Sequence, residues 1–113
     1  MTDITKCKVV GLTFTERYPD WCYELADALE ADTHLGESLP VVLKANPANK
    51  FDSDAIEVHV PFLNSMVGHV PRTHNKPIAE GMRAGYIYLA ELAVRIHPDH
   101  PENPGLDITI KRM

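Results

Sequence analysis

Two segments near the middle of the sequence hold polar residues at well-defined positions. Residues 46–58 read NPANKFDSDAIEV, and residues 67–72 read VGHVPR. The carboxylate of Asp52 can accept a hydrogen bond from a hydroxyl group, and His69 and Arg72 can donate to a phosphate, for which a guanidinium group is especially suited. The residue types therefore allow a site for a ligand that carries both groups.

The same residues also fit a purely structural role. Asp52 and Asp54 can close an Asx turn and cap a hairpin, as acidic residues in such loops usually do. Charged residues are common in exposed loops, and their presence by itself identifies no site. Both interpretations stay open on residue types alone.

The sequence gives little support to a metal site. His97 and His100 bracket Asp99, but structural zinc sites draw on closely spaced Cys and His pairs, and neither a CxxC nor an HExxH motif occurs. The acids of residues 52–57 lack the glycine and the distant glutamate of a calcium loop. We expect solvated loop histidines and no bound metal.

Catalytic motifs are also absent from the sequence. It contains neither a GxSxG motif nor a glycine-rich phosphate-binding loop. Cys7 falls in a predicted apolar strand and Cys22 in a predicted amphipathic helix, which favours structural roles for both thiols. We therefore predict a protein that is not an enzyme and uses no cofactor.

The composition is that of one small globular domain. The chain has 113 residues and a mass of 12.6 kDa, enough to bury one ordinary core. A hydrophobic content of 44% and a charged content of 24% exclude wholesale disorder. The sequence shows no signal region at its start and no apolar stretch of membrane-spanning length, so we expect a cytoplasmic protein without membrane contact.

The net charge of −5 is unevenly distributed along the chain. Residues 1–40 hold three basic and eight acidic residues, whereas residues 41–113 hold eight of each, so the first segment carries the whole excess. Glu24, Asp27 and Glu30 are spaced by three, which puts them on one face of a helix. This acidic stripe is either a solvated face or a surface for a basic protein partner.

Hydrophobic patterns predict a mainly β protein of the α+β class. Alternating apolar residues predict six strands, at residues 6–14, 41–45, 55–60, 66–71, 86–96 and 106–111. Irregular structure is predicted at residues 32–37 and, because of three prolines, at residues 97–105. Such a set of elements indicates a small antiparallel barrel that helices cover at an end or an edge.

Two helices are predicted beside these strands. The first follows an N-cap at Asp20 and covers residues 21–31. The second covers residues 73–85, with Thr73 or Asn75 as the cap and Pro77 in the first turn.

The two polar segments, together with VVGLTF at residues 9–14, resemble the HIRAN domain family. Its pattern is a VGL-type strand, an N-P-x-N-x-[YF]-D-x-x-A-I-x-V block and a V-G-[HY]-[IVL]-[PK]-[RK] motif. The resemblance runs from about Val9 to Ile96, and we interpret residues 1–113 as a single HIRAN-like domain with an acidic helical insertion at about 18–38. It implies a six-stranded antiparallel OB-like barrel with two short α-helices.

The resemblance also implies a function. HIRAN domains occur joined to fork-remodelling DNA translocases and to nucleases, and alone in bacteria and phages, and this chain resembles the stand-alone type. The best-described type of member binds the 3′-hydroxyl end of single-stranded DNA in a pocket. We therefore expect a DNA-binding module with a role in DNA repair or replication.

Matching positions assign roles to individual residues of this chain. By resemblance, Asp52 accepts the terminal hydroxyl, Phe14 stacks on a base and Phe51 is structural. His69 and Arg72 match the phosphate-contacting positions. The full set of expected DNA-binding residues is Phe14, Asp52, His69, Arg72 and, as a weaker addition, Lys76.

The chain departs from the pattern of the DNA-end binders at two places. They carry one basic and two aromatic residues after the first glycine, whereas this chain has Thr13, Phe14 and Thr15. Residues 97–105 contain no Phe, Tyr or Trp that would stack on a base from the other side. The loss of phosphate contacts predicts weaker binding with a shallower salt dependence.

A rival hypothesis assigns the chain to another functional class. In it, Glu24, Asp27 and Glu30 bind a basic surface of a DNA-processing enzyme. The chain would then be an acidic protein-interaction module encoded by a phage or a mobile element.

Overall fold

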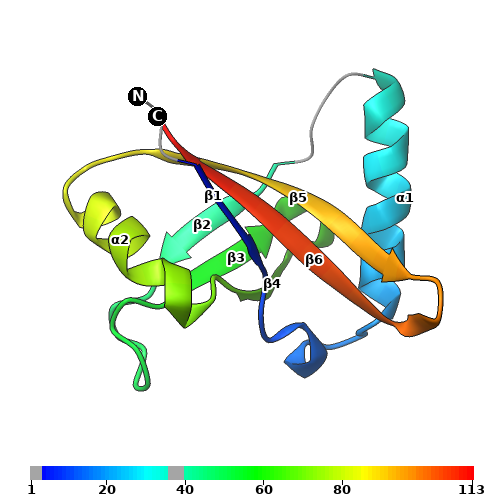
Figure 1. Ribbon diagram of the computed structural model, residues 1–113, viewed down its shortest axis with the longest axis horizontal. Helices are drawn as coiled ribbons and strands as arrows, with labels where there is room; N and C mark the ends of the chain where they lie inside the picture. Colours follow the sequence, from blue (N-terminus) through cyan, green and yellow to red (C-terminus); the bar gives the residue numbers. More distant parts are fainter. Residues whose placement is uncertain (1–3, 36–39) are drawn as a thin grey trace.

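The computed structural model describes residues 4–35 and 40–113. Within them the chain forms six strands, two α-helices and two short 3-10 helices (Figure 1). The strands are β1 (Ile4–Lys8), β2 (Val42–Ala45), β3 (Ile56–Val60), β4 (Ser65–His69), β5 (Tyr88–His97) and β6 (His100–Arg112). The helices are η1 (Leu12–Phe14), α1 (Asp20–Leu35), η2 (Pro61–Leu63) and α2 (Arg72–Arg83).

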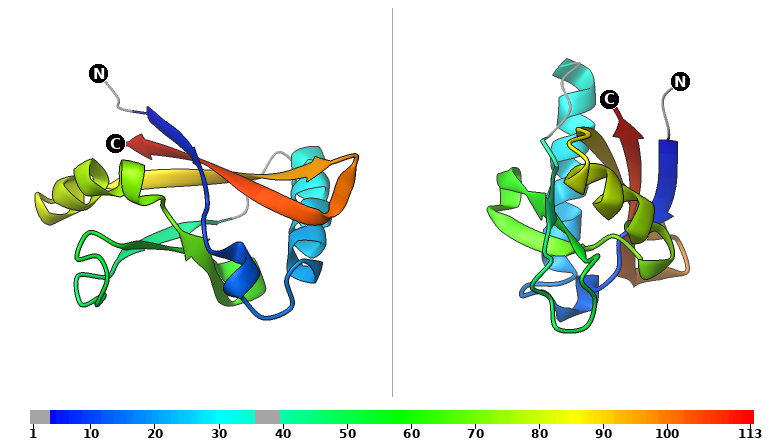
Figure 2. Two further views of the ribbon diagram at one scale, coloured as in Figure 1. Left: turned by 60° about the horizontal axis from the view of Figure 1, so that its bottom comes forward. Right: turned by 90° about the vertical axis from the view of Figure 1, so that its left-hand side faces the viewer.

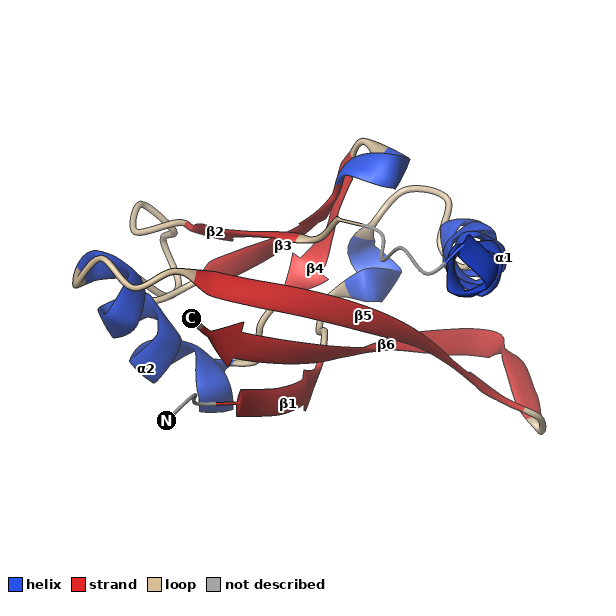
Figure 3. Cartoon of the chain, turned by 90° about the horizontal axis from the view of Figure 1, so that it is seen from above, coloured by secondary structure: helices blue, strands red, loops and turns tan. Residues whose placement is uncertain are grey.

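The strands form two separate antiparallel sheets rather than one closed barrel. One sheet has the order β1-β6-β5 and the other β2-β3-β4. Figure 3 shows one sheet lying over the other. The prediction of a mainly β fold with six strands and two helices is confirmed, but the two sheets do not close into the predicted barrel.

The first strand is shorter than predicted. β1 ends at Lys8, and Gly11 adopts a left-handed conformation with φ of 85° that turns the chain into η1. Beyond β1, the Val9 amide donates to the Leu106 carbonyl oxygen over 2.9 Å, and Val10 forms an isolated bridge with His69.

The core lies between the two sheets and under α1. Trp21, Cys22 and Leu25 line the buried face of α1, which packs against β5 and β6. Removing each large apolar side chain from water contributes about 1.5–3 kcal/mol to stability. The alternating residues of β3 and β6 form the centre of this core, and they are Ile56, Val58, Val60, Leu106, Ile108 and Ile110.

The segment predicted to be irregular at residues 97–105 is instead the end of a long hairpin. β6 includes Pro101 and Pro104 and pairs with β5 on one side. Its pairing with β1 stops at Asp107, so the prolines lie where the second neighbour is missing and the β5–β6 register shifts. The Tyr18 hydroxyl donates to the Pro104 carbonyl oxygen over 2.7 Å and ties the start of α1 to this hairpin.

Both α-helices differ in detail from their predictions. α1 continues to Leu35, because no glycine or proline interrupts the sequence from Asp20 to that point. Of the loop predicted at residues 32–37, the last two residues lie outside the described part of the chain. α2 begins at Arg72, and Pro77 falls inside it rather than in its first turn.

The two helices lie at opposite ends of the molecule (Figure 2). The long axis of the molecule measures 38 Å. Among the described residues, no helix is both long enough and apolar enough to cross a membrane. Burial raises the pKa of the Cys22 thiol to about 11, so this side chain is protonated at neutral pH, in agreement with a structural role.

Candidate functional site

The loop between β2 and β3 is built around Asn49. Its Oδ1 atom accepts hydrogen bonds from the backbone amides of Phe51, over 2.9 Å, and of Asp52, over 3.1 Å. The base of the loop is closed by the amide of Asn46, which donates to the Ala55 carbonyl oxygen over 2.8 Å. This is an Asx turn at Asn49, and it precedes the Asx turn that the sequence predicted at Asp52, whose Oδ1 atom accepts from the amide of Asp54.

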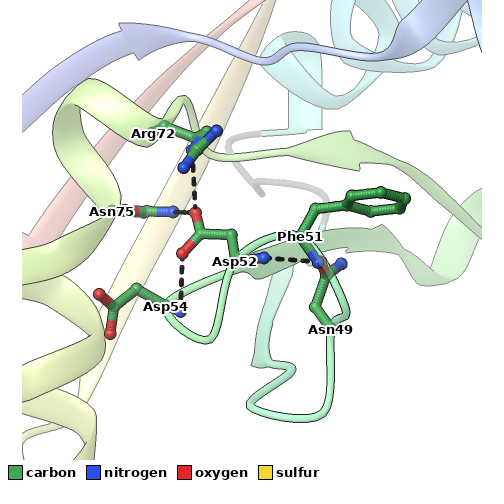
Figure 4. A network of polar contacts seen from close by, with 6 residues as sticks. All are labelled: Asn49, Phe51, Asp52, Asp54, Arg72 and Asn75. Atoms are coloured by element: carbon green, nitrogen blue, oxygen red, sulfur yellow. Dashed lines mark hydrogen bonds and ion pairs between the residues drawn. The ribbon is translucent and has the colours of Figure 1, made fainter.

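Asp52 lies where this loop meets the first turn of α2 (Figure 4). Its Oδ1 atom accepts from the amide of Asp54 over 2.9 Å, and its Oδ2 atom accepts from Nδ2 of Asn75 over 2.8 Å. The Nε atom of Arg72 is 3.6 Å from Oδ2. The bonds from Asn75 and Asp54 and the charge of Arg72 hold the pKa of Asp52 below its ordinary value, so the group is an ionised hydrogen-bond acceptor.

A pocket of about 210 Å³ opens beside Asp52. Three stretches of the chain line it, from residues 10–11, 49–55 and 69–75. Asp52, His69 and Arg72, which the sequence analysis selected, all belong to this lining. The complete lining is Val10, Gly11, Asn49, Phe51, Asp52, Ala55, His69, Val70, Arg72 and Asn75.

His69 ends β4 at the wall of the pocket and lies opposite Glu57 of β3. The Oε1 atom of Glu57 is 2.9 Å from Nε2 of His59, and Oε2 accepts from Nδ2 of Asn46 over 3.1 Å. The contact with His59, together with the bond from Asn46 and the charge of His69, lowers the pKa of Glu57. An ionised carboxylate thus lies opposite His69 on the neighbouring strand.

The two aromatic residues near the pocket are both exposed. Phe51 lines the pocket with 88% of its surface exposed, and its ring points away from the Asp52 carboxylate (Figure 4). The prediction that Phe51 is a structural residue is wrong, because its ring does not pack in the core. Phe14 on η1 is 93% exposed and lies outside the pocket lining, three residues after Gly11 of the lining.

Lys76 is exposed on α2 and is not part of the pocket lining. Its neighbour Asn75, expected only as a possible cap, instead donates to Asp52 and is 3% exposed. The spacing of Arg72 and Asn75 could have revealed this contact, because residues three apart share a helix face. Asn49 was visible in the sequence only as one of several turn-forming residues.

The acidic stripe lies away from this pocket. Glu24, Asp27 and Glu30 are exposed on α1, at the other end of the molecule from α2 and the β2–β3 loop (Figures 1 and 2). Glu24 forms an ion pair with Arg17, which offsets part of the charge. The stripe therefore does not border the pocket, and its role in binding a partner stays a prediction.

The histidines that suggested a metal site face each other at the tip of the β5–β6 hairpin. The rings of His97 and His100 have centroids 5.5 Å apart, and Nδ1 of His97 accepts from the amide of Asp99. In the described ranges, no group of three or more His, Cys, Asp or Glu side chains is placed to hold a metal ion.

Solved structures of known proteins have a similar fold, but the sequence comparisons find no match. No model of a known protein family matches the sequence, and no curated protein matches it. The HIRAN domain of human HLTF is similar in structure, with a TM-score of 0.59 and 17% identity over 96% of this chain and 75% of that chain. The fold is HIRAN-like.

A second solved structure has the same degree of similarity. It is a protein from Lactobacillus plantarum, with a TM-score of 0.59 and 19% identity over 100% of both chains. At these identities the likeness shows the HIRAN-like fold and does not assign a ligand. The function must be argued from the pocket itself.

Proposed function

We propose that this protein is a non-enzymatic module that binds the 3′-hydroxyl end of single-stranded DNA in the pocket beside Asp52. The observation that carries the proposal is an ionised carboxylate, fixed by protein donors, in one pocket with His69 and Arg72. A carboxylate accepts a hydrogen bond from a terminal hydroxyl and repels a terminal phosphate. The HIRAN-like fold is consistent with a DNA-binding module.

The neighbouring residues supply the contacts that a DNA end needs. Arg72 and His69 donate to the phosphate of the last nucleotides, and Lys76 adds positive charge farther along α2. Phe51 of the pocket lining and Phe14, three residues after Gly11, offer exposed rings for base stacking, a contact worth about 1–3 kcal/mol per base. Phosphate contacts are few, so we expect modest affinity with a shallow salt dependence.

Fluorescence anisotropy with labelled oligothymidines tests the proposal. We expect tighter binding of a strand with a 3′-hydroxyl than of the same strand with a 3′-phosphate, and loss of this preference in Asp52→Ala. Asp27→Ala removes the same charge at the other end of the molecule and should leave the preference intact. Equal binding of both strands by the unmodified protein, or an unchanged preference in Asp52→Ala, contradicts end recognition.

The acidic stripe supports a second candidate function that is compatible with the first. Its three exposed carboxylates lie at the end of the molecule remote from the pocket, so a basic protein surface could bind there while DNA occupies the pocket. The partner would be a DNA-processing protein, in a phage, a mobile element or a bacterial cytoplasm. Affinity capture with Glu24, Asp27 and Glu30 all replaced by lysine tests this function, and an unchanged set of captured proteins contradicts it.

A further inference from the structure

Asn75 is the buried polar residue among those that line the pocket. It is 3% exposed, on a helix face that otherwise buries Ile78 and Ala79. Its backbone amide donates to the Pro71 carbonyl oxygen over 3.0 Å, within the first turn of α2. A buried amide needs a hydrogen-bond partner, and this one has Asp52.

The contact between Asn75 and Asp52 is closer than the ion pair between Arg72 and Asp52. Nδ2 of Asn75 is 2.8 Å from Oδ2 of Asp52, whereas Nε of Arg72 is 3.6 Å from the same atom. The Arg72 side chain is 80% exposed, so solvent weakens its pairing. The Asp52 carboxylate is therefore held in place by Asn75 and by the amide of Asp54, and Arg72 stays available for a phosphate.

We propose that Asn75 is a positioning residue that sets the preference of the pocket for a hydroxyl-bearing end. Oδ1 and Oδ2 of Asp52 each accept one hydrogen bond from the protein, so the carboxylate is fixed in orientation. Its remaining lone pairs can accept a hydrogen bond only from a ligand group that carries a donor hydrogen. A hydroxyl meets this requirement and a phosphate does not. This inference rests on the proposed function and adds the residue that holds the discriminating carboxylate in place.

The test replaces Asn75 in the full chain by leucine, which has the same number and branching of side-chain heavy atoms and no donor. Thr73→Ala, an exposed change in the same helical turn, is the control. We measure the ratio of affinities for oligothymidines that end in a 3′-hydroxyl and in a 3′-phosphate. The ratio should fall by about five-fold or more in Asn75→Leu. In Arg72→Ala both affinities should fall together and the ratio should change little.

A second measurement needs no DNA. In a carbon-detected NMR titration, the midpoint of the Asp52 carboxyl should be higher in Asn75→Leu than in the unmodified protein or Thr73→Ala. An unchanged midpoint shows that Asn75 does not hold the carboxylate. If Asn75→Leu does not fold, Asn75→Ala takes its place with the same expectations.

The two measurements separate the possible failures. Equal affinities of the unmodified protein for both strands overturn the proposed function and, with it, the role of Asn75 in discrimination. A clear preference that persists in a folded Asn75→Leu variant overturns the inference alone. A raised midpoint together with a reduced ratio supports both.

Discussion

Val10 and His69 exchange two backbone hydrogen bonds, of 3.0 Å from the Val10 amide and 2.9 Å from the His69 amide. This bridge joins the chain before η1 to the end of β4 and so sets the distance between two walls of the pocket. Gly68 permits the close approach, since a Cβ atom there would lie 2.4 Å from the Val10 carbonyl oxygen. The backbone at this bridge therefore tolerates no larger residue without moving.

Gly68→Ala should destabilise the fold by about 1–3 kcal/mol, because the added methyl group meets backbone and the Val9 side chain rather than a flexible chain end. Urea denaturation measures the loss. Ser65→Ala, an exposed change on the same strand, should stay within about 0.5 kcal/mol. If Gly68→Ala had unchanged stability, the backbone at the bridge between Val10 and His69 would be able to move apart at little cost.

Phe14→Ala and Phe51→Ala should each weaken the binding of single-stranded DNA by about five-fold or more, since each would remove a stacking surface. Thermal unfolding should be nearly unchanged, because both rings are exposed in the free protein. Phe62→Ala is the matched control, an exposed phenylalanine in η2 outside the pocket lining. If all three variants bind alike, stacking is not part of the mechanism.

Arg72→Ala should weaken binding and also make it less sensitive to salt. Loss of one phosphate contact on a single strand reduces the slope of log affinity against log salt concentration by about 0.7. Anisotropy titrations at several salt concentrations measure this slope. Lys111→Ala removes an equal charge from the exposed surface of β6 and should leave the slope unchanged. A slope that is the same in both variants would remove Arg72 from the set of phosphate contacts.

The ionised form of Asp52 should contribute to stability in a pH-dependent way. Folding lowers the pKa of this group below its ordinary value of 3.8, through the bonds from Asn75 and Asp54 and the nearby charge of Arg72. The contribution is therefore complete above that value and is lost as the pH falls through the lower folded-state pKa. Asp52→Asn should be less stable than the unmodified protein at neutral pH, with a difference that narrows below pH 3.8. Denaturation curves across this range would contradict the assignment if the difference stayed constant.

Replacing Glu24, Asp27 and Glu30 by lysine should leave the preference for a hydroxyl end unchanged. The three residues lie on α1, at the opposite end of the molecule from the pocket, and exposed charges are screened beyond about 10 Å at 0.1 M salt. Total DNA affinity at low salt should rise, because six units of charge are gained. A changed end preference in moderate salt would place the stripe near the bound strand.

Hydrophobic alternation was sufficient to predict most of the fold. The buried residues of β3, and those of β6 from Leu106 to Ile110, follow a period of two, and the predicted hairpin of β3 and β4 is confirmed. The end of the first strand and the irregular segment 97–105 were predicted wrongly for a shared reason. The first strand ends at Lys8, and β6 continues through Pro101 and Pro104. Both depend on which strands lie alongside, and the local sequence does not contain that information.

The candidate site was predictable in part. Asp52, His69 and Arg72 are brought to one pocket as expected, because a turn and a strand end fix their positions. Asn75 and the exposed ring of Phe51 were missed, since the first acts across 23 residues and phenylalanine side chains are most often buried. The roles of these residues in binding stay predictions.

The pocket takes its walls from residues 10–11, 49–55 and 69–75, so no short peptide of this chain contains it. It exists only when β4 has paired with the N-terminal segment and α2 has docked on the β2–β3 loop. A ligand of this pocket can therefore bind only the fully folded chain, and by mass action it shifts the folding equilibrium toward that state. An oligonucleotide that fits should raise the melting temperature and slow proteolysis of the whole domain, which makes heat or protease resistance a simple screen for its natural ligand.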